Sequence, residues 1–402
     1  MISGNPPPRV LLIAPQPFYE DRGTPIAIRH VAIALSERGW LVDILTYGVG
    51  QDVASPGIRI FRFGMWFRFK TVPIGLSLKK LLLDSAMPWA IWKQLKRNKY
   101  DCLHAVEEAV YPALILGRMT KIPVIYDMQS SIAEQLAMHP LLRFLGLGRL
   151  MGWFERQACA KAACVACSAG LAQKYSGTGR RTAVSEWTFP AGSEQVATVD
   201  ALLIRRELKI PASRQVVMYA GNFAHYQGLS ILMAAAPLVI AACPETVFVL
   251  VGAGQEDMRR LSSKFAKLIE EEKLILIPRQ SRQRVRQLLG IADVAVSPRA
   301  AGSNFPLKIF DYLAAGLPVV ASDIAAHRVP AGNALILVPP TPRGIADGIL
   351  SLLQNPQYAE RLRQEAREIY AHDLAWPLFC EQVMSIYNAA LADSKLRSPT
   401  GA

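Results

Sequence analysis

The segment Ser303 to Ser322 holds the residues best suited to chemistry in this chain. Pro306 fits the first turn of a helix, and Asn304 could cap that turn. Amides in the stretch Phe305 to Lys308 would then lie at the positive end of the helix dipole. Such a helix start can hold the negative charge of a diphosphate.

Two charged side chains extend this interpretation. Lys308 and Asp311 are three residues apart and share one face of the expected helix. They match the two ends of a nucleoside diphosphate, with Lys308 for the phosphates and Asp311 for the ribose hydroxyls. The alternative is a surface ion pair on a packing helix.

Parallel sheets covered by helices must position these residues, because short apolar runs alternate with longer helical patterns. The expected strands of the first half are Val10–Ala14, Leu41–Thr46, Ile58–Phe63, Cys102–Val106, Val124–Tyr126 and Cys164–Cys167. The second series is Val216–Tyr219, Thr246–Val251, Leu274–Ile277, Val294–Ser297 and Val319–Ala321. The chain therefore reads as two doubly wound α/β units joined within Trp187–Pro211, a segment with little strand character.

The composition is that of a globular protein of two domains. The 402 residues are 51% hydrophobic and 19% charged. No apolar run reaches the roughly 18 residues of a membrane-spanning helix, and the first residues lack a signal-peptide pattern, so we expect a cytoplasmic protein. The pair Cys164 and Cys167 admits a zinc site, but without a second pair or a histidine cluster we favour buried core thiols.

The net charge of +13 is concentrated in residues 59–99, where ten Lys or Arg stand against the single Asp84. Large aromatic residues are interleaved with these cations, among them Trp66, Trp89 and Trp92. This mixture suits an anionic membrane surface. Nucleic acid is a rival partner, and a partly buried aromatic set with a solvated lysine face is a third interpretation.

The segment Ser303 to Ser322 resembles the donor-site signature of glycosyltransferase family 4. In that family two acidic residues flank seven others and lead into a helix, a glycine and a Pro-Val-Val-Ala strand. Asp311 takes the second acidic place, and Ser303 stands where the first carboxylate would be. The resemblance implies a GT-B fold of two Rossmann-like domains facing each other across a cleft. It also implies nucleotide-sugar contacts from the segment that contains Ser303, Asn304, Phe305, Pro306, Leu307 and Asp311.

Other turns of the second half resemble family counterparts in order. Asn222 and Gln227 stand roughly where many relatives carry an Arg and a Lys for the diphosphate, so neutral hydrogen bonds would replace charge there. Gly252 lies in a glycine turn that lets a backbone approach the nucleotide. The departures place the diphosphate charge on Lys308, assisted by Arg299, and these two are the expected catalytic residues.

The first half supplies the opposite side of the expected site. Gly23 belongs to the first loop, which would face the nucleotide sugar. His104 and Glu107 resemble the family's strand that ends in His and Glu, and Gln129 stands where many members carry a histidine that bonds the donor sugar. Gln129 can form a hydrogen bond there but cannot act as a base. These three residues are assigned to the acceptor or sugar side.

The resemblance assigns residues 1–190 to an acceptor-side domain and 191–372 to a donor domain. Residues 373–402 form a C-terminal helix that could pack back on the first domain. The expected enzyme retains anomeric configuration and moves a sugar from a UDP- or GDP-sugar to a lipid-linked or polysaccharide acceptor. It would need no metal or cofactor, bind no nucleic acid, and work at the inner face of the plasma membrane in cell-envelope or exopolysaccharide synthesis.

Two other classes of function stay open. A sugar-nucleotide epimerase or hydrolase could share the fold, but the site is poor in acid and base groups around a sugar ring. A non-catalytic sugar or nucleic-acid binder would fit the charge and the missing carboxylate.

Overall fold

The computed structural model describes residues 6–19, 23–52, 55–67, 69, 72, 77–138, 146–167, 169–175, 200–300, 306–324, 327–328, 334–372 and 375–397. It divides the chain into two compact units. Unit 1 comprises Met1–Thr188 with Pro377–Ala402, and unit 2 comprises Phe189–Trp376. The divisions expected from the sequence lie after residues 190 and 372.

Unit 1 is built on a six-stranded sheet in which every strand pairs in parallel. Its strands are β1 (Arg9–Ala14), β2 (Leu41–Tyr47), β3 (Ile58–Phe63), β4 (Cys102–Val106), β5 (Val124–Met128) and β6 (Cys164–Cys167). The spatial order β3-β2-β1-β4-β5-β6 reverses direction between β1 and β4. This order is that of a doubly wound fold, whose ligands bind beyond the strand ends at the reversal.

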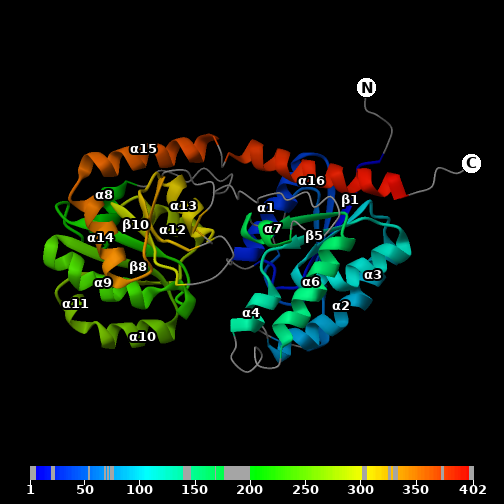
Figure 1. Cartoon of the computed structure of the whole chain (residues 1–402), viewed down its shortest axis with the longest axis horizontal. Coiled ribbons are helices and arrows are strands. Elements are labelled where there is room, and N and C mark those ends of the chain that lie inside the picture. Colours follow the sequence, from blue (N-terminus) through cyan, green and yellow to red (C-terminus); the bar gives the residue numbers. More distant parts are fainter. Residues whose placement is uncertain are drawn as a thin grey trace, which may run out of the picture. The chain divides into compact units, whose positions relative to one another are not determined.

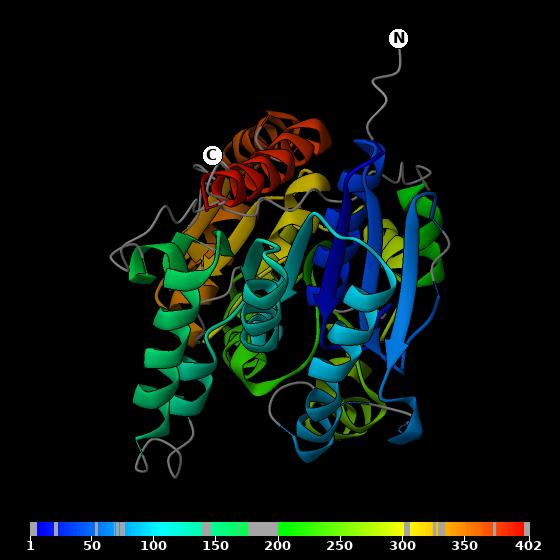
Figure 2. The same ribbon diagram turned by 90° about the vertical axis from the view of Figure 1, so that its right-hand side faces the viewer.

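Helices cover both faces of this sheet (Figures 1 and 2). They are α1 (Gly23–Glu37), α2 (Leu78–Arg97), α3 (Val110–Thr120), α4 (Ile132–Met138), α6 (Leu147–Lys161), α7 (Ala169–Tyr175) and α16 (Trp376–Arg397), with short 3-10 turns η1 (Met65–Phe67) and η2 (Glu107–Ala109). One core joins the sheet to α2, α3, α6 and α7. The C-terminal helix α16 packs within unit 1, where Phe379 meets His30 and Tyr387 meets Trp40 edge to face.

Unit 2 repeats the same topology with the order β12-β11-β10-β7-β8-β9. Its strands are β7 (Gln215–Ala220), β8 (Thr246–Ala253), β9 (Leu274–Pro278), β10 (Val294–Ser297), β11 (Val319–Ser322) and β12 (Leu335–Val338). Its helices are α8 (Ala201–Glu207), α9 (Leu229–Ala242), α10 (Gln255–Lys264), α11 (Ala266–Glu270), α12 (Arg282–Leu289), α13 (Lys308–Ala314), α14 (Pro342–Leu353) and α15 (Pro356–His372), with η3 (His225–Gln227) before α9. Here the order reverses between β7 and β10.

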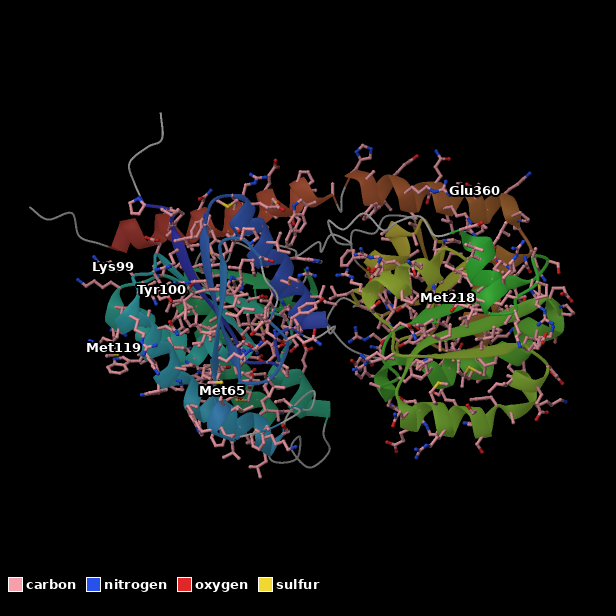
Figure 3. All side chains as sticks on the ribbon, turned by 180° about the vertical axis from the view of Figure 1, so that it is seen from behind. Met65, Lys99, Tyr100, Met119, Met218 and Glu360 are labelled. Atoms are coloured by element: carbon pink, nitrogen blue, oxygen red, sulfur yellow. The ribbon has the colours of Figure 1, made fainter. Side chains whose placement is uncertain are left out.

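The prediction of two doubly wound parallel sheets is confirmed, and each of the eleven predicted runs lies within an observed strand. Two buried cores, one on each face, hold the sheet of unit 2 between its helices. Met218 on the central strand β7 lies inside unit 2 (Figure 3). The sixth strand of this sheet, β12, was not predicted.

One described stretch, His225–Ala242, is long and apolar enough to cross a membrane by length and composition alone. Most of it is α9, whose Leu232, Ala235 and Val239 are fully buried against the sheet of unit 2. One face of α9 therefore packs into unit 2, while the stretch as a whole is 39% buried.

Candidate active site

The turn after β7 and the start of α13 meet at the reversal point of the second sheet. Lys308, the first residue of α13, directs its ammonium group to the Tyr219 hydroxyl at 3.0 Å and to Gln227 Oε1 at 2.8 Å. Its Nζ also lies 4.1 Å from the centre of the Tyr219 ring, so a cation–π contact fixes its direction. Lys308 and Gln227, predicted from separate motifs, are therefore in direct contact.

Tyr312 anchors α13 to this strand end. The fully buried Tyr312 hydroxyl accepts a hydrogen bond from the Ala220 amide at 2.9 Å and lies 3.2 Å from the Ala220 carbonyl oxygen. Because Ala220 is the last residue of β7, this double contact sets where Lys308 points. The sequence pattern did not indicate this role for Tyr312.

Two glycines shape the turns that surround Lys308. A Cβ added to Gly252 would lie 2.2 Å from the Gly221 carbonyl oxygen, and its φ of +113° also disfavours other residues. A Cβ on Gly228 would lie 1.7 Å from the Pro298 carbonyl oxygen. The backbone after β10 therefore passes directly against the start of α9.

That passing backbone carries Arg299 into the site. Arg299 is 7% exposed, and its guanidinium lies 5.2 Å from the centre of the Tyr226 ring. Burial and the nearby Arg299 guanidinium hold the pKa of Lys308 well below its usual range. Among the described residues, no carboxylate forms an ion pair with Lys308. The turn thus gathers two cations, and for Lys308 the described partners are neutral.

His327 is a neighbour that sequence reasoning missed. Its Nδ1 donates to the Ser322 carbonyl oxygen at 2.7 Å, so its Nε2 accepts from the Ser297 hydroxyl at 3.0 Å. Burial, together with Arg299 and Lys308, lowers the pKa of His327 to about 4. The imidazole is therefore neutral at physiological pH and ties the ends of β10 and β11 together.

Asp311 is held from a different direction than Lys308. Its Oδ1 lies 3.1 Å from an Arg282 nitrogen and 3.7 Å from Arg286 Nε, both on α12. The expected ribose contact of Asp311 stays a prediction. The packing of α12 beside α13 creates this pairing, which no local pattern indicates.

Other predicted residues of unit 2 are placed as follows. Asn222 Oδ1 accepts from the Ala224 amide at 3.2 Å, so its side chain shapes the turn after β7. Pro306 is buried and Leu307 is half-buried just before α13. The helix begins at Lys308, two residues after Pro306. Pro306 has no N–H group to donate to a phosphate. Ser303, Asn304 and Phe305 lie outside the described residues.

A second group of predicted residues gathers at the strand ends of unit 1. His104 is fully buried, with Nε2 3.3 Å from Asp127 Oδ2 and Nδ1 2.9 Å from the Tyr387 hydroxyl of α16. Asp127 Oδ2 also accepts from Gln129 Nε2 at 3.0 Å. In its neutral form His104 donates to Asp127 and accepts from Tyr387. A direct contact of His104 with a substrate would require the side chains that bury it to move.

Glu107 combines strain with an altered pKa. Its φ of +49° lies in the left-handed region that non-glycine residues rarely adopt. The Ser130 hydroxyl donates to Glu107 Oε1 at 2.7 Å, while burial and the adjacent Glu108 raise the pKa of Glu107 to about 7. Lys80 of α2 pairs with Glu108 at 2.6 Å. A carboxyl group with these properties can exchange a proton near neutral pH.

The remaining predictions concern the first loop and metals. Gly23 is the first residue of α1, and residues 20–22 before it lie outside the described part of the chain. Cys164 and Cys167 are buried on β6. Among the described residues, no group of three or more His, Cys, Asp or Glu is arranged to hold a metal ion.

Comparisons with known proteins match both halves of the chain. Residues 22–184 match the model of the glycosyl transferase 4-like domain, and residues 200–369 match the model of glycosyl transferases group 1. A phosphatidyl-myo-inositol mannosyltransferase of Mycobacterium leprae is 25% identical, over 97% of this chain and 99% of its own length.

Solved structures share the whole fold. Sucrose-phosphate synthase from Thermosynechococcus elongatus has a TM-score of 0.78 at 19% identity and covers 96% of this chain and 100% of its own. Anabaena HepE in complex with UDP and glucose has a TM-score of 0.71 at 17% identity, over 95% of this chain and 99% of its own. At these identities the likeness concerns the fold.

Proposed function

Because the chain belongs to the family 4 type of glycosyltransferases with the GT-B fold, we propose that it moves a sugar from a UDP- or GDP-sugar to a lipid-linked or polysaccharide acceptor. The observation that carries this proposal is the placement of Lys308. A buried ammonium group beside a second cation, with neutral described partners, suits a doubly charged diphosphate.

The donor is assigned to unit 2. Lys308 and Arg299 neutralise the leaving diphosphate, while the hydrogen bond from Lys308 to Gln227 orients the ammonium group. Asp311 accepts hydrogen bonds from the ribose, and the turn at Gly252 lets the nucleotide lie close to the backbone. The solved relative with bound UDP and glucose supports a nucleotide-sugar donor.

The acceptor is assigned to unit 1. Glu107, with a pKa near 7, hydrogen-bonds an acceptor hydroxyl, and Gln129 offers its amide oxygen to the sugar because its nitrogen is engaged by Asp127. A relative named for phosphatidyl-myo-inositol supports a lipid-linked acceptor. We further propose that the reaction retains anomeric configuration, needs no metal, and serves envelope or exopolysaccharide synthesis at the inner face of the plasma membrane, with residues 59–99 at the lipid.

The test is release of UDP or GDP from candidate sugar donors in the presence of a membrane lipid extract. One donor should release its nucleotide only when extract is present, and NMR of the product should show the donor's own anomer. Release without extract would favour a hydrolase, and no release from any donor would contradict sugar transfer.

A further inference from the structure

The outer surface of α2 carries apolar side chains that the core does not use. On its inner side Leu83, Met87 and Ile91 are buried in the core of unit 1. The opposite side presents side chains that are 41% to 74% exposed, namely Leu78, Leu81, Leu82, Trp89 and Trp92. A surface helix normally places polar residues there, so this second apolar stripe indicates a partner.

The same surface continues onto α3 and α6. The two helices cover the sheet face that α2 covers, α2 contacts α3, and α3 contacts α6. Their exposed large side chains are Ile115 and Met119 on α3 and Leu150, Trp153 and Phe154 on α6. Met119 lies at the edge of unit 1 in Figure 3, and Met65 of η1 is 62% exposed. These residues fall outside the window 59–99, except for Met65.

The exposed charges on these helices have one sign. Nine Lys and Arg side chains are exposed on α2, α3, α6 and the turns that end them, among them Lys96, Arg118, Lys121, Arg149 and Arg156. Within residues 77–138 and 146–161 the one exposed acid is Asp101. This imbalance is the complement of an anionic surface.

Cations and aromatic rings are also coupled in pairs. Lys93 Nζ lies 4.8 Å from the centre of the Trp89 ring and Lys96 Nζ 5.7 Å from that of Trp92. Such pairs place a ring at the level of lipid headgroups with a cation at the phosphates. Trp66 of η1 meets Trp89 edge to face at 6.0 Å and extends the aromatic set.

We propose that the outer faces of α2, α3 and α6 form one docking surface for an anionic lipid bilayer, hereafter the docking face. A second copy of the chain is disfavoured because two faces of the same positive sign would repel each other. Nucleic acid would use the cations but would leave the exposed leucines, isoleucine and methionine without a partner. A bilayer accepts both kinds of side chain.

The docking face also has a functional consequence. Helix α2 carries Lys80, which pairs with Glu108 next to the candidate acceptor residue Glu107. The helix that rests on the lipid is thus tied by an ion pair to the carboxyl group that would meet a lipid-linked acceptor. This step rests on the proposed function, whereas bilayer docking by itself does not.

The experiment is co-sedimentation of the full chain with phosphatidylcholine vesicles, with and without phosphatidylglycerol. The proposal predicts binding that requires phosphatidylglycerol and weakens as salt is added. Equal binding to both vesicles, or none to either, would overturn it.

Two double variants outside residues 59–99 test the extent of the docking face. Trp153→Ser with Phe154→Ser should weaken vesicle binding about tenfold, because two partly inserted rings are lost. The matched control is Leu202→Ser with Leu203→Ser on α8 of unit 2, where both side chains are 55% exposed, as Trp153 is. The control should bind like the wild type, and circular dichroism should show both variants folded.

Charge removal gives an independent result. Arg118→Gln with Arg156→Gln should weaken binding about 25-fold, because each cation near an anionic surface contributes about fivefold. Arg206→Gln with Arg259→Gln, exposed on unit 2, is the control. Equal effects of variant and control would contradict a local face.

Three further outcomes separate the rivals. Loss of a dimer in Trp153→Ser with Phe154→Ser, without any vesicle binding by the wild type, would assign the face to a second copy. RNA binding without vesicle binding would assign it to nucleic acid. Vesicle binding without nucleotide release from any donor would leave the docking face intact and contradict the transferase.

Discussion

The ammonium group of Lys308 lies 2.8 Å from the amide oxygen of Gln227, a neutral acceptor. The two residues are 81 positions apart and meet where the strand order of unit 2 reverses. A neutral acceptor directs the lysine without neutralising it, which leaves its charge available for an anion.

Gln227→Glu should therefore impair nucleotide binding. The new carboxylate would pair with Lys308 and repel a diphosphate, so we expect the affinity for the nucleotide to fall at least about tenfold. The variant should nevertheless melt at or above the wild-type temperature, because the ion pair compensates the buried lysine. Calorimetric titration with UDP and GDP measures the affinity, and Gln227→Ala is the control with a smaller expected loss. An unchanged affinity of Gln227→Glu for the nucleotide would contradict the role of Lys308 in binding it.

Gly228→Ala should disrupt the turn before α9. The added Cβ would lie 1.7 Å from the Pro298 carbonyl oxygen, and the φ of +72° is unfavourable for alanine. We expect a loss of about 3 kcal/mol or more in the free energy of unfolding. The control is Gly39→Ala, with a similar φ of +83° but nothing within 4 Å of its Cβ, which should lose only about 1 kcal/mol. Equal losses in urea denaturation would show that the close approach is absent.

Glu107 should make stability depend on pH. Its pKa is raised from 4.5 to about 7, so the folded chain holds a proton that the unfolded chain loses first. The stability that this raised pKa gives the folded state is fully present below pH 4.5 and is lost as the pH rises through 7. Glu107→Gln removes the titration. The free energy of unfolding of this variant minus that of the wild type should therefore be on the order of 1–3 kcal/mol larger at pH 7.5 than at pH 4.5. The same difference at both pH values in urea denaturation would refute this assignment.

Tyr387→Phe should destabilise unit 1 through His104. The change removes the hydroxyl that donates to the buried His104 Nδ1 at 2.9 Å and leaves that nitrogen without this donor. The expected cost is about 1–3 kcal/mol. Tyr358→Phe on α15 is the control, because the Tyr358 hydroxyl makes no hydrogen bond among the described residues. If both variants unfold at the same urea concentration, the hydrogen bond between Tyr387 and His104 contributes little to the free energy of unfolding.

The fold could be predicted because fully buried parallel strands are apolar along their whole length. Runs such as Val10–Ala14 are apolar throughout, since both faces of the strand are covered. The edge strand β12 was not predicted although its residues, Leu335–Val338, are all apolar; three of the four are only partly buried or exposed.

The site was only partly predictable, because its residues meet through tertiary packing. Local motifs indicated Lys308 and Gln227 separately, but not that they touch. The pairing of Asp311 with Arg282 joins α13 to α12, and the contact of Tyr387 with His104 joins α16 to β4; no sequence period encodes either adjacency. For residues 373–402 the sequence indicated a helix that could pack back on the first domain, but not the contacts of α16 with His30, Trp40 and His104.

The most direct test of the account is calorimetric titration of the wild type and of Lys308→Ala with UDP, GDP and their sugars. We expect the wild type to bind one nucleotide class and Lys308→Ala to bind it about 10- to 100-fold more weakly, because a charge-assisted contact is lost. Lys267→Ala, an exposed lysine of unit 2, should bind like the wild type. Equal affinity in Lys308→Ala and the wild type would contradict the claim that Lys308 holds the diphosphate.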